Sequence, residues 1–216
     1  MKTHSTHAAQ SVRDQLLQHA SVLIRQRGYN GFSYRDLAEL VGVKTSSIHY
    51  HFPAKDDLVL EVVRLYRERS QARLAAIDIS LPLAEQAWQY IRPLRSDIEL
   101  NQICLAGMLS AEVLALPDAI RVPLQAHYRM NEDWIASLLR RAEQARGERY
   151  PVPPAALATV LYGAIQNGII TARMSGSKDR LDAAADMLMG AVGSSLQTVQ
   201  AHVADEAAKV AEAVPA

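Results

Sequence analysis

The sequence predicts an all-α protein, and three observations lead to this class. Only 10 of the 216 residues are glycine and 9 are proline, so few positions interrupt a helix. About half of the residues are apolar, which is enough to bury a core. Apolar residues recur three and four positions apart between isolated breakers, the spacing of helices with one buried face. We expect about nine helices.

The first part of the chain predicts three short helices joined by tight turns. Their expected limits are residues 12–27, 33–41 and 44–51. Gly28 and Gly42 end the first two helices, as glycines at helix C-termini commonly do. Ser33, followed three residues later by Asp36, resembles a capping box at the start of the second helix. Pro53 closes the third.

The rest of the chain predicts longer amphipathic helices. One begins near Lys55 and is expected to reach Ser80. Prolines and glycines then divide the chain into further helices, expected at 83–97, 99–116, 118–146, 155–173 and 179–203. We therefore predict a helix-turn-helix DNA-binding domain over 1–54, a sensing and dimerisation domain over 55–204, and a disordered, Ala-rich tail over 205–216.

Charge is unevenly distributed, although the formal net charge is zero. Residues 1–52 carry six Lys or Arg against three Asp or Glu, and the remainder carries seventeen against twenty. A basic N-terminal part is compatible with a nucleic-acid contact. The single cysteine, Cys104, cannot form an intramolecular disulfide, and the N-terminus lacks the apolar core of a signal peptide. We expect a cytoplasmic protein with no membrane partner.

The outward face of the third predicted helix carries hydrogen-bond donors and no acid. Small hydroxyl groups allow a helix to enter the major groove and reach base edges, whereas Lys, Tyr and His suit phosphates. Ala38, Gly42 and Ile48 have the spacing of a helix-turn-helix, which an ordinary pair of packed helices could share. The candidate DNA-contacting residues on this helix are Lys44, Thr45, Ser46, Ser47, His49 and Tyr50.

The segment from Gly28 to Leu58, GYNGFSYRDLAELVGVKTSSIHYHFPAKDDL, closely resembles the DNA-binding signature of the TetR family. The resemblance covers about a quarter of the chain. It implies an operator-binding homodimer with a C-terminal domain that binds a small-molecule inducer, and no metal or cofactor.

Carried over residue by residue, the resemblance implies a recognition helix that includes Thr45, Ser46 and Tyr50. It adds Ser33 and Tyr34 at the start of the second helix and Lys55 on a phosphate. Two positions depart from the family pattern. Lys44 stands where a small hydroxyl residue is common, and His49 stands where tyrosine is commonest.

Histidines of the N-terminal part are not expected to bind a metal. His49 and His51 are two residues apart, and such residues do not face one another on a helix. His4 and His7 lie in the N-terminal tail and receive no role.

The sensing domain offers candidates of a weaker kind. Aromatic and sulfur-containing side chains commonly line apolar ligand cavities, although core packing is the simpler interpretation of any single one. The candidates for ligand binding are Tyr66, Trp88, Tyr90, Cys104, Met108, Tyr128, Trp134 and Tyr162.

The last two predicted helices have broad apolar stripes, which we expect to form the homodimer interface. The buried helices of a monomer would show the same stripes. The candidate interface residues are Leu161, Ala164, Gly168, Leu188, Val192 and Leu196.

Cys104 lies in an apolar stretch, ICLAGM, where a thiol is usually inert and its pKa is raised. The longer stretch ICLAGMLSAE, followed by Leu116-Pro117, resembles a subgroup of TetR regulators, some of which sense electrophiles through cysteine. A thiol-based sensor acting through Cys104 is therefore the alternative to reversible ligand binding. An activated thiol needs a neighbouring cation or a helix N-terminus, and the sequence places neither beside Cys104.

Three function classes compete, and a transcriptional repressor is the leading one. An enzyme finds little support, because phosphate loops, nucleophile elbows and two-histidine metal motifs do not occur in the sequence. A nonspecific architectural DNA-binder is disfavoured by the zero net charge. A repressor and an activator would share all of these features.

Overall fold

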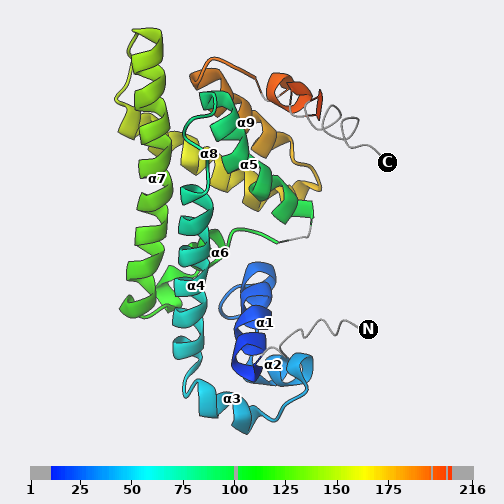
Figure 1. Cartoon of the computed structure of the whole chain (residues 1–216). Coiled ribbons are helices and arrows are strands. Elements are labelled where there is room, and N and C mark those ends of the chain that lie inside the picture. Colours follow the sequence, from blue (N-terminus) through cyan, green and yellow to red (C-terminus); the bar gives the residue numbers. More distant parts are fainter. Residues whose placement is uncertain (1–10, 100–101, 196, 203, 206–216) are drawn as a thin grey trace, which may run out of the picture.

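The structure, a computed structural model, describes residues 11–99, 102–195, 197–202 and 204–205, and these residues are helical or connect helices (Figure 1). The α-helices are α1 (Val12–Arg27), α2 (Tyr34–Val41), α3 (Thr45–His51), α4 (Lys55–Ala75), α5 (Leu83–Glu99), α6 (Leu105–Ala111), α7 (Asp118–Arg146), α8 (Pro154–Ser175) and α9 (Asp179–Ala191). A short 3-10 helix, η1 (Val113–Ala115), lies between α6 and α7. The all-α prediction is confirmed.

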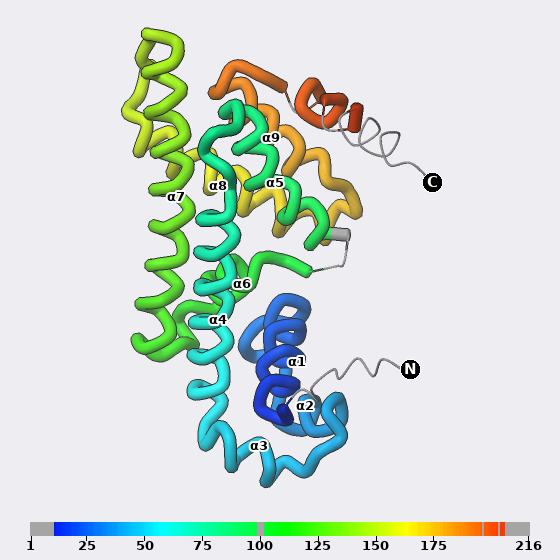
Figure 2. Tube along the Cα trace, in the orientation of Figure 1, coloured from blue at the N-terminus to red at the C-terminus, as the bar shows by residue number. Residues whose placement is uncertain are grey.

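Helices α1, α2 and α3 gather at one end of the molecule, and the larger helices form the body (Figures 1 and 2). Helix α4 runs from this end into the body, where it packs along α7. Helix α8 packs against both α7 and α9. Helix α4 therefore links the N-terminal head to the body directly.

One buried apolar core continues from the head into the body. Leu16 and Ile24 of α1, Ile48 of α3 and Leu58 of α4 are all fully buried in the same cluster that includes Ile165 of α8. Apolar packing is therefore continuous across the boundary between the head and the body.

Helix α8 is the one described helix that is long and apolar enough to cross a membrane. Only 44% of its apolar window is buried within the protomer. It packs between α7 and α9, so core packing explains part of this apolar character, and its exposed residues are considered below.

Two predicted helices end earlier than expected. Helix α4 ends at Ala75 rather than near Ser80, and Ser80 instead donates its backbone N–H to Asp78 in a turn. The predicted helix 179–203 stops at Ala191, because Gly193 adopts a left-handed φ of 84°. Predictions for residues 206–216 and for Leu196, His4 and His7 lie outside the described residues.

The predicted helix over 99–116 was also wrong. Residues 102–104 are not helical, and only α6 and η1 follow. The Arg25 side chain of α1 donates through Nε to the carbonyl of Ile103 at 2.8 Å. A long-range partner thus takes a carbonyl that a continuous helix would have paired internally.

Candidate DNA-binding face and sensing cavity

The second helix is held by local hydrogen bonds of the predicted kind. Ser33 caps α2 by accepting a hydrogen bond from the backbone of Asp36, while its own backbone N–H donates to the Asp36 carboxylate at 2.7 Å. Gly42 follows with a φ of 74°, which a side chain would strain. Helices α2 and α3 are therefore set at a defined turn.

The outer face of α3 is free for a partner. Lys44, Thr45, Ser46 and Tyr50 are exposed, and Tyr50 retains 84% of its accessible surface. Ile48, on the opposite face, is fully buried. An aromatic side chain this exposed at the end of a donor-rich helix is typical of a nucleic-acid contact.

Other predicted DNA-binding residues are partly engaged within the protein. Tyr34 donates its hydroxyl to the carbonyl of Phe52 at 2.8 Å, and burial raises its pKa to about 12. His49 stacks edge-on against Tyr34, and its Nδ1 lies 3.2 Å from the carbonyl of Pro53. Ser47 is half-buried. The contacts of Tyr34 and His49 therefore hold α3 against α2 and the start of α4.

The Lys55 side chain makes contacts within the head, and its predicted phosphate contact stays a prediction. Its Nζ donates to the carbonyl of Phe32 at 2.6 Å and to the carbonyl of Tyr29 at 2.5 Å, and it lies over both rings. Burial lowers the pKa of Lys55, while Glu112 and nearby aspartates oppose this effect. The ammonium group ties the loop between α1 and α2 to the start of α4.

Arg35 is an exposed cation outside the predicted set of DNA-contacting residues. It lies in the first turn of α2, directly after Tyr34. Its position at the start of a helix, beside a predicted DNA-binding residue, is a sequence signal that could have marked Arg35 as a candidate DNA contact.

Buried polar contacts join the head to the body. Arg25 of α1 is buried and pairs with Asp97 of α5 at 2.7 Å. It also donates to the side chain of Gln102 and to the carbonyl of Ile103. Arg173 of α8 donates to the last-turn carbonyl of Arg25 at 2.8 Å.

A second contact lies in the loop after α1. Gly28 has a φ of 79°, and a Cβ atom there would lie 2.3 Å from Oε1 of Glu112, the residue that ends α6. The Glu112 carboxylate accepts the backbone N–H of Asn30 at 3.0 Å. Helices α5, α6 and α8 thus contact the end of α1 directly.

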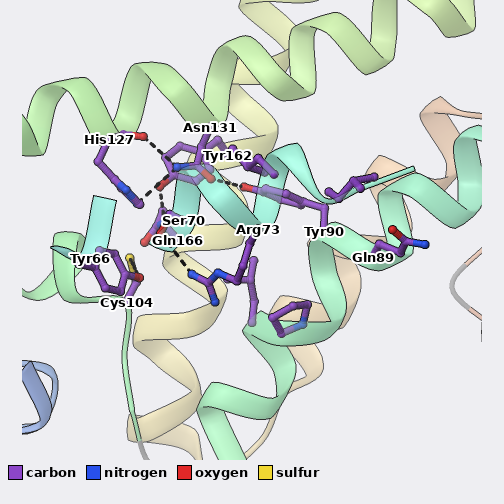
Figure 3. A pocket seen from close by; sticks show the side chains of 14 residues that line it. Tyr66, Ser70, Arg73, Gln89, Tyr90, Cys104, His127, Asn131, Tyr162 and Gln166 are labelled. Carbon is purple, nitrogen blue, oxygen red and sulfur yellow. Dashed lines mark hydrogen bonds between the residues drawn. The ribbon is translucent and has the colours of Figure 1, made fainter. Parts of the chain in front are cut away.

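A small cavity lies between α4, α5, α7 and α8, with a volume of about 40 Å³ (Figure 3). Of the predicted ligand residues, Tyr66, Tyr90, Cys104 and Tyr162 line it. Residues that the sequence analysis did not select also line it, and the polar ones are Ser70, Arg73, Gln89, His127, Asn131 and Gln166.

The other predicted ligand residues do not line this cavity. Trp88 lines an adjoining hollow between α4 and α5, and Trp134 stacks on Tyr90 with ring centroids 4.8 Å apart. Tyr128 lies edge-on to Tyr162, behind the cavity wall. Met108 packs against the core.

Cys104 lies beside two polar side chains (Figure 3). Tyr66 donates its hydroxyl to Sγ at 3.4 Å. Burial raises the pKa of the Cys104 thiol, but its interactions with His127, together with Tyr66, more than offset this effect and lower the pKa to about 7. The apolar stretch around Cys104 predicted a raised pKa, and that prediction was wrong because His127 arrives from α7.

His127 and Asn131 are four residues apart on α7, so they share one face of the helix. Asn131 accepts the Tyr90 hydroxyl at 3.1 Å and donates to the carbonyl of His127 at 2.8 Å. Two polar residues at this spacing on an otherwise apolar face are a signal that could have located the cavity.

The predicted dimer residues are largely used within the protomer. Leu161 and Leu188 are buried in the core, and a Cβ atom on Gly168 would lie 2.6 Å from the Cα of Leu181. Ala164 and Val192 are half-buried. Each helix has a second, exposed stripe, made of Val160, Gly163, Asn167, Ile170 and Met174 on α8 and Arg180, Ala183, Met187 and Gly190 on α9.

Comparison with known proteins identifies the family. The family described as "Bacterial regulatory proteins, tetR family" matches residues 16–62. A TetR-family transcriptional regulator from Agrobacterium tumefaciens superimposes with a TM-score of 0.77 at 30% identity, covering 83% of this chain and 96% of that one.

Two repressors are similar over most of their length. The HTH-type transcriptional repressor DhaR of Mycobacterium sp. (strain GP1) is 23% identical over 79% of this chain and 87% of its own. The HTH-type transcriptional repressor AcnR of Corynebacterium diphtheriae is 26% identical over 85% and 92%. With its capped α2, its exposed α3 and these similarities over about four fifths of the chain, the protein belongs to the TetR family of bacterial transcriptional regulators.

Proposed function

We propose that this protein is a cytoplasmic, homodimeric repressor that releases its operator DNA when a small molecule occupies the cavity beneath α4. The observation that carries the DNA-binding part is the exposed, acid-free outer face of α3. The related proteins DhaR and AcnR are named as repressors. We assign DNA reading to residues 1–54 and sensing and dimerisation to residues 55–204.

Roles on the DNA-binding face follow from side-chain chemistry. Thr45 and Ser46 are small enough to approach base edges, whereas Lys44, Tyr50 and Arg35 suit phosphates. Ser33, Tyr34 and His49 hold α2 and α3 in position.

The exposed stripes of α8 and α9 favour a dimer through a four-helix bundle. Val160, Ile170, Met174 and Met187 each leave 41% or more of their surface exposed. Apolar residues at helical spacing on adjoining helices are typical of a subunit interface. Two heads carried on such a dimer would reach successive major grooves.

Release would follow from a change in the spacing of the heads. Helix α4 connects Lys55 in the head with Arg73 at the cavity, and Arg25 ties the head to residues 102–103, next to Cys104. A ligand that prefers one arrangement of these walls shifts the population of head spacings.

The test is binding of the purified protein to its own promoter region and to random DNA at one salt concentration. We expect specific binding to be tighter by about a thousandfold or more. Tyr50→Ala should weaken binding to all sequences, whereas Thr45→Ala should alter base preference. Equal affinity for promoter and random DNA would contradict a regulator.

A second candidate is a thiol-based sensor acting through Cys104. The specific observation is the imidazole of His127 beside a thiol whose pKa is lowered to about 7. The thiolate would add to an electron-poor alkene carbon, forming an S–C bond, and the neighbouring carbon would take up a proton. If Cys104→Ala releases operator as readily as the wild type when N-ethylmaleimide is added, this candidate is excluded.

A further inference from the structure

A second hollow, the outer hollow, lies between α4 and α5 and adjoins the inner cavity. Arg73, Ile77, Gln89 and Pro93 line both spaces. The outer hollow has a volume of about 330 Å³. It is the only part of the site with room for more than a few water molecules, so a ligand would have its body here and one end in the inner cavity.

The charge of this site is positive. Among the described residues that line the inner cavity, Arg73 is the only Lys, Arg, Asp or Glu. Its guanidinium donates to the hydroxyl of Ser70 at 3.2 Å and forms no ion pair within the described part of the chain. Arg92 adds a second guanidinium in the outer hollow, where Glu85, the one acid, lies 3.6 Å from His202.

Buried polar atoms in the walls lack partners. Oε1 of Gln166 is buried without a hydrogen bond from the described residues, and the side chain is more than nine-tenths buried. The indole Nε1 of Trp88, in the outer hollow, is also buried and unpaired. An unpaired buried polar group is costly, so each such atom indicates a ligand group or water that would pair with it.

We propose that the molecule sensed here is a small organic carboxylate with a compact apolar or aromatic body and a hydroxyl group at its far end. Its carboxylate pairs with Arg73, whose planar guanidinium matches a carboxylate with two parallel hydrogen bonds. Its body packs on Ile77 and Pro93 in the outer hollow, and its hydroxyl reaches the inner cavity and donates to Oε1 of Gln166. This inference rests on the proposed ligand-responsive function and specifies the class of ligand.

The experiment compares matched acids and amides by calorimetry on the full-length protein without DNA. The probes are benzoate, 4-hydroxybenzoate and phenylacetate, each paired with its carboxamide of nearly equal shape. We expect at least one acid to bind about tenfold or more tightly than its amide, since only the acid gains the charge-assisted pair with Arg73. Equal affinities within every pair, or no binding by any acid at millimolar concentration, would overturn the proposal.

Three variants separate the role of Arg73 from general effects of charge. Arg73→Gln should abolish the preference for the acid, and Arg73→Lys should restore part of it. Arg69→Gln makes the same change one turn earlier on α4, at an arginine that is exposed like Arg73 but lines neither space, and should keep the preference. If Arg73→Gln and Arg69→Gln bind the acid alike, the assignment to Arg73 is wrong.

Operator release is measured separately with the acid that binds. An acid that binds through Arg73 without releasing operator supports the ligand class and contradicts the proposed induction. The two proposals therefore fail in distinguishable ways.

Discussion

At the scale of single residues, the reactivity of the Cys104 thiol depends on the neighbouring side chain of His127. The thiol lies in a cavity, and His127 stabilises its charged form. Because the thiolate is the reactive species, the pKa controls the rate of alkylation.

Alkylation of Cys104 by iodoacetamide should follow a pKa of about 7, so that the rate rises through neutral pH and then levels off. A thiol at its ordinary pKa would still accelerate above pH ~8.5. His127→Gln should move the midpoint upward, because the stabilising group is lost while burial remains. The measurement is the rate at a series of pH values, with the unfolded protein as the control for thiol content.

An unchanged midpoint in His127→Gln would show that the imidazole does not stabilise the thiolate. The midpoint of the rate against pH reports the pKa of the thiol. A change in the access of iodoacetamide to Cys104 would scale the rates at all pH values equally and would leave this midpoint unchanged.

Lys55 is a stabilising residue of the head. Lys55→Ala leaves the carbonyls of Tyr29 and Phe32 without their donor and should lower the free energy of unfolding by about 1–2 kcal/mol. Denaturant unfolding followed by circular dichroism measures this. Lys44→Ala, an exposed lysine with no such contacts, is the control and should change stability by less than about 0.5 kcal/mol. Equal effects of the two substitutions would contradict the assigned role.

At the scale of elements, the end of α1 is the junction between the head and the body. Arg25 makes a buried ion pair and further hydrogen bonds there, so Arg25→Ala leaves Asp97 half-buried without its cation. We expect a loss of about 3 kcal/mol in the free energy of unfolding. Denaturant unfolding of the wild type and the variant measures this difference in free energy, provided that both transitions have the same denaturant dependence.

The control is Arg27→Ala, two residues along the same helix, where the exposed guanidinium lies 3.6 Å from Asp36. Solvent screens such a surface pair, so this substitution should change stability far less than Arg25→Ala.

The milder Asp97→Asn keeps the shape of the junction and should weaken the coupling between ligand binding and operator release. Intact coupling in this variant would exclude the Arg25 contact as the route.

At the scale of the whole molecule, the exposed stripes of α8 and α9 should determine the oligomeric state. Met187→Glu puts a charge on an exposed apolar stripe and should shift the protein toward monomers in sedimentation velocity. Operator affinity should fall with it, because a single head contacts one major groove. Val122→Glu, at an exposed site on α7, is the matched control. A stable dimer of Met187→Glu would exclude this face.

The sequence by itself determined the local features of the head. Ser33, Asp36 and Gly42 interact with neighbours in the chain, and the donor-rich face of α3 follows from helical spacing, so these features are readable without a fold. The all-α class and most helix limits follow from the same short-range patterns.

Tertiary structure alone decided what depends on distant partners. Residues 102–104 leave the helical state because Arg25 takes the carbonyl of Ile103, 78 residues away. The pKa of Cys104 falls because His127 arrives from α7. On α8 and α9, periodicity marks apolar stripes, but packing decides which stripe faces the core, since both stripes repeat at the same helical spacing.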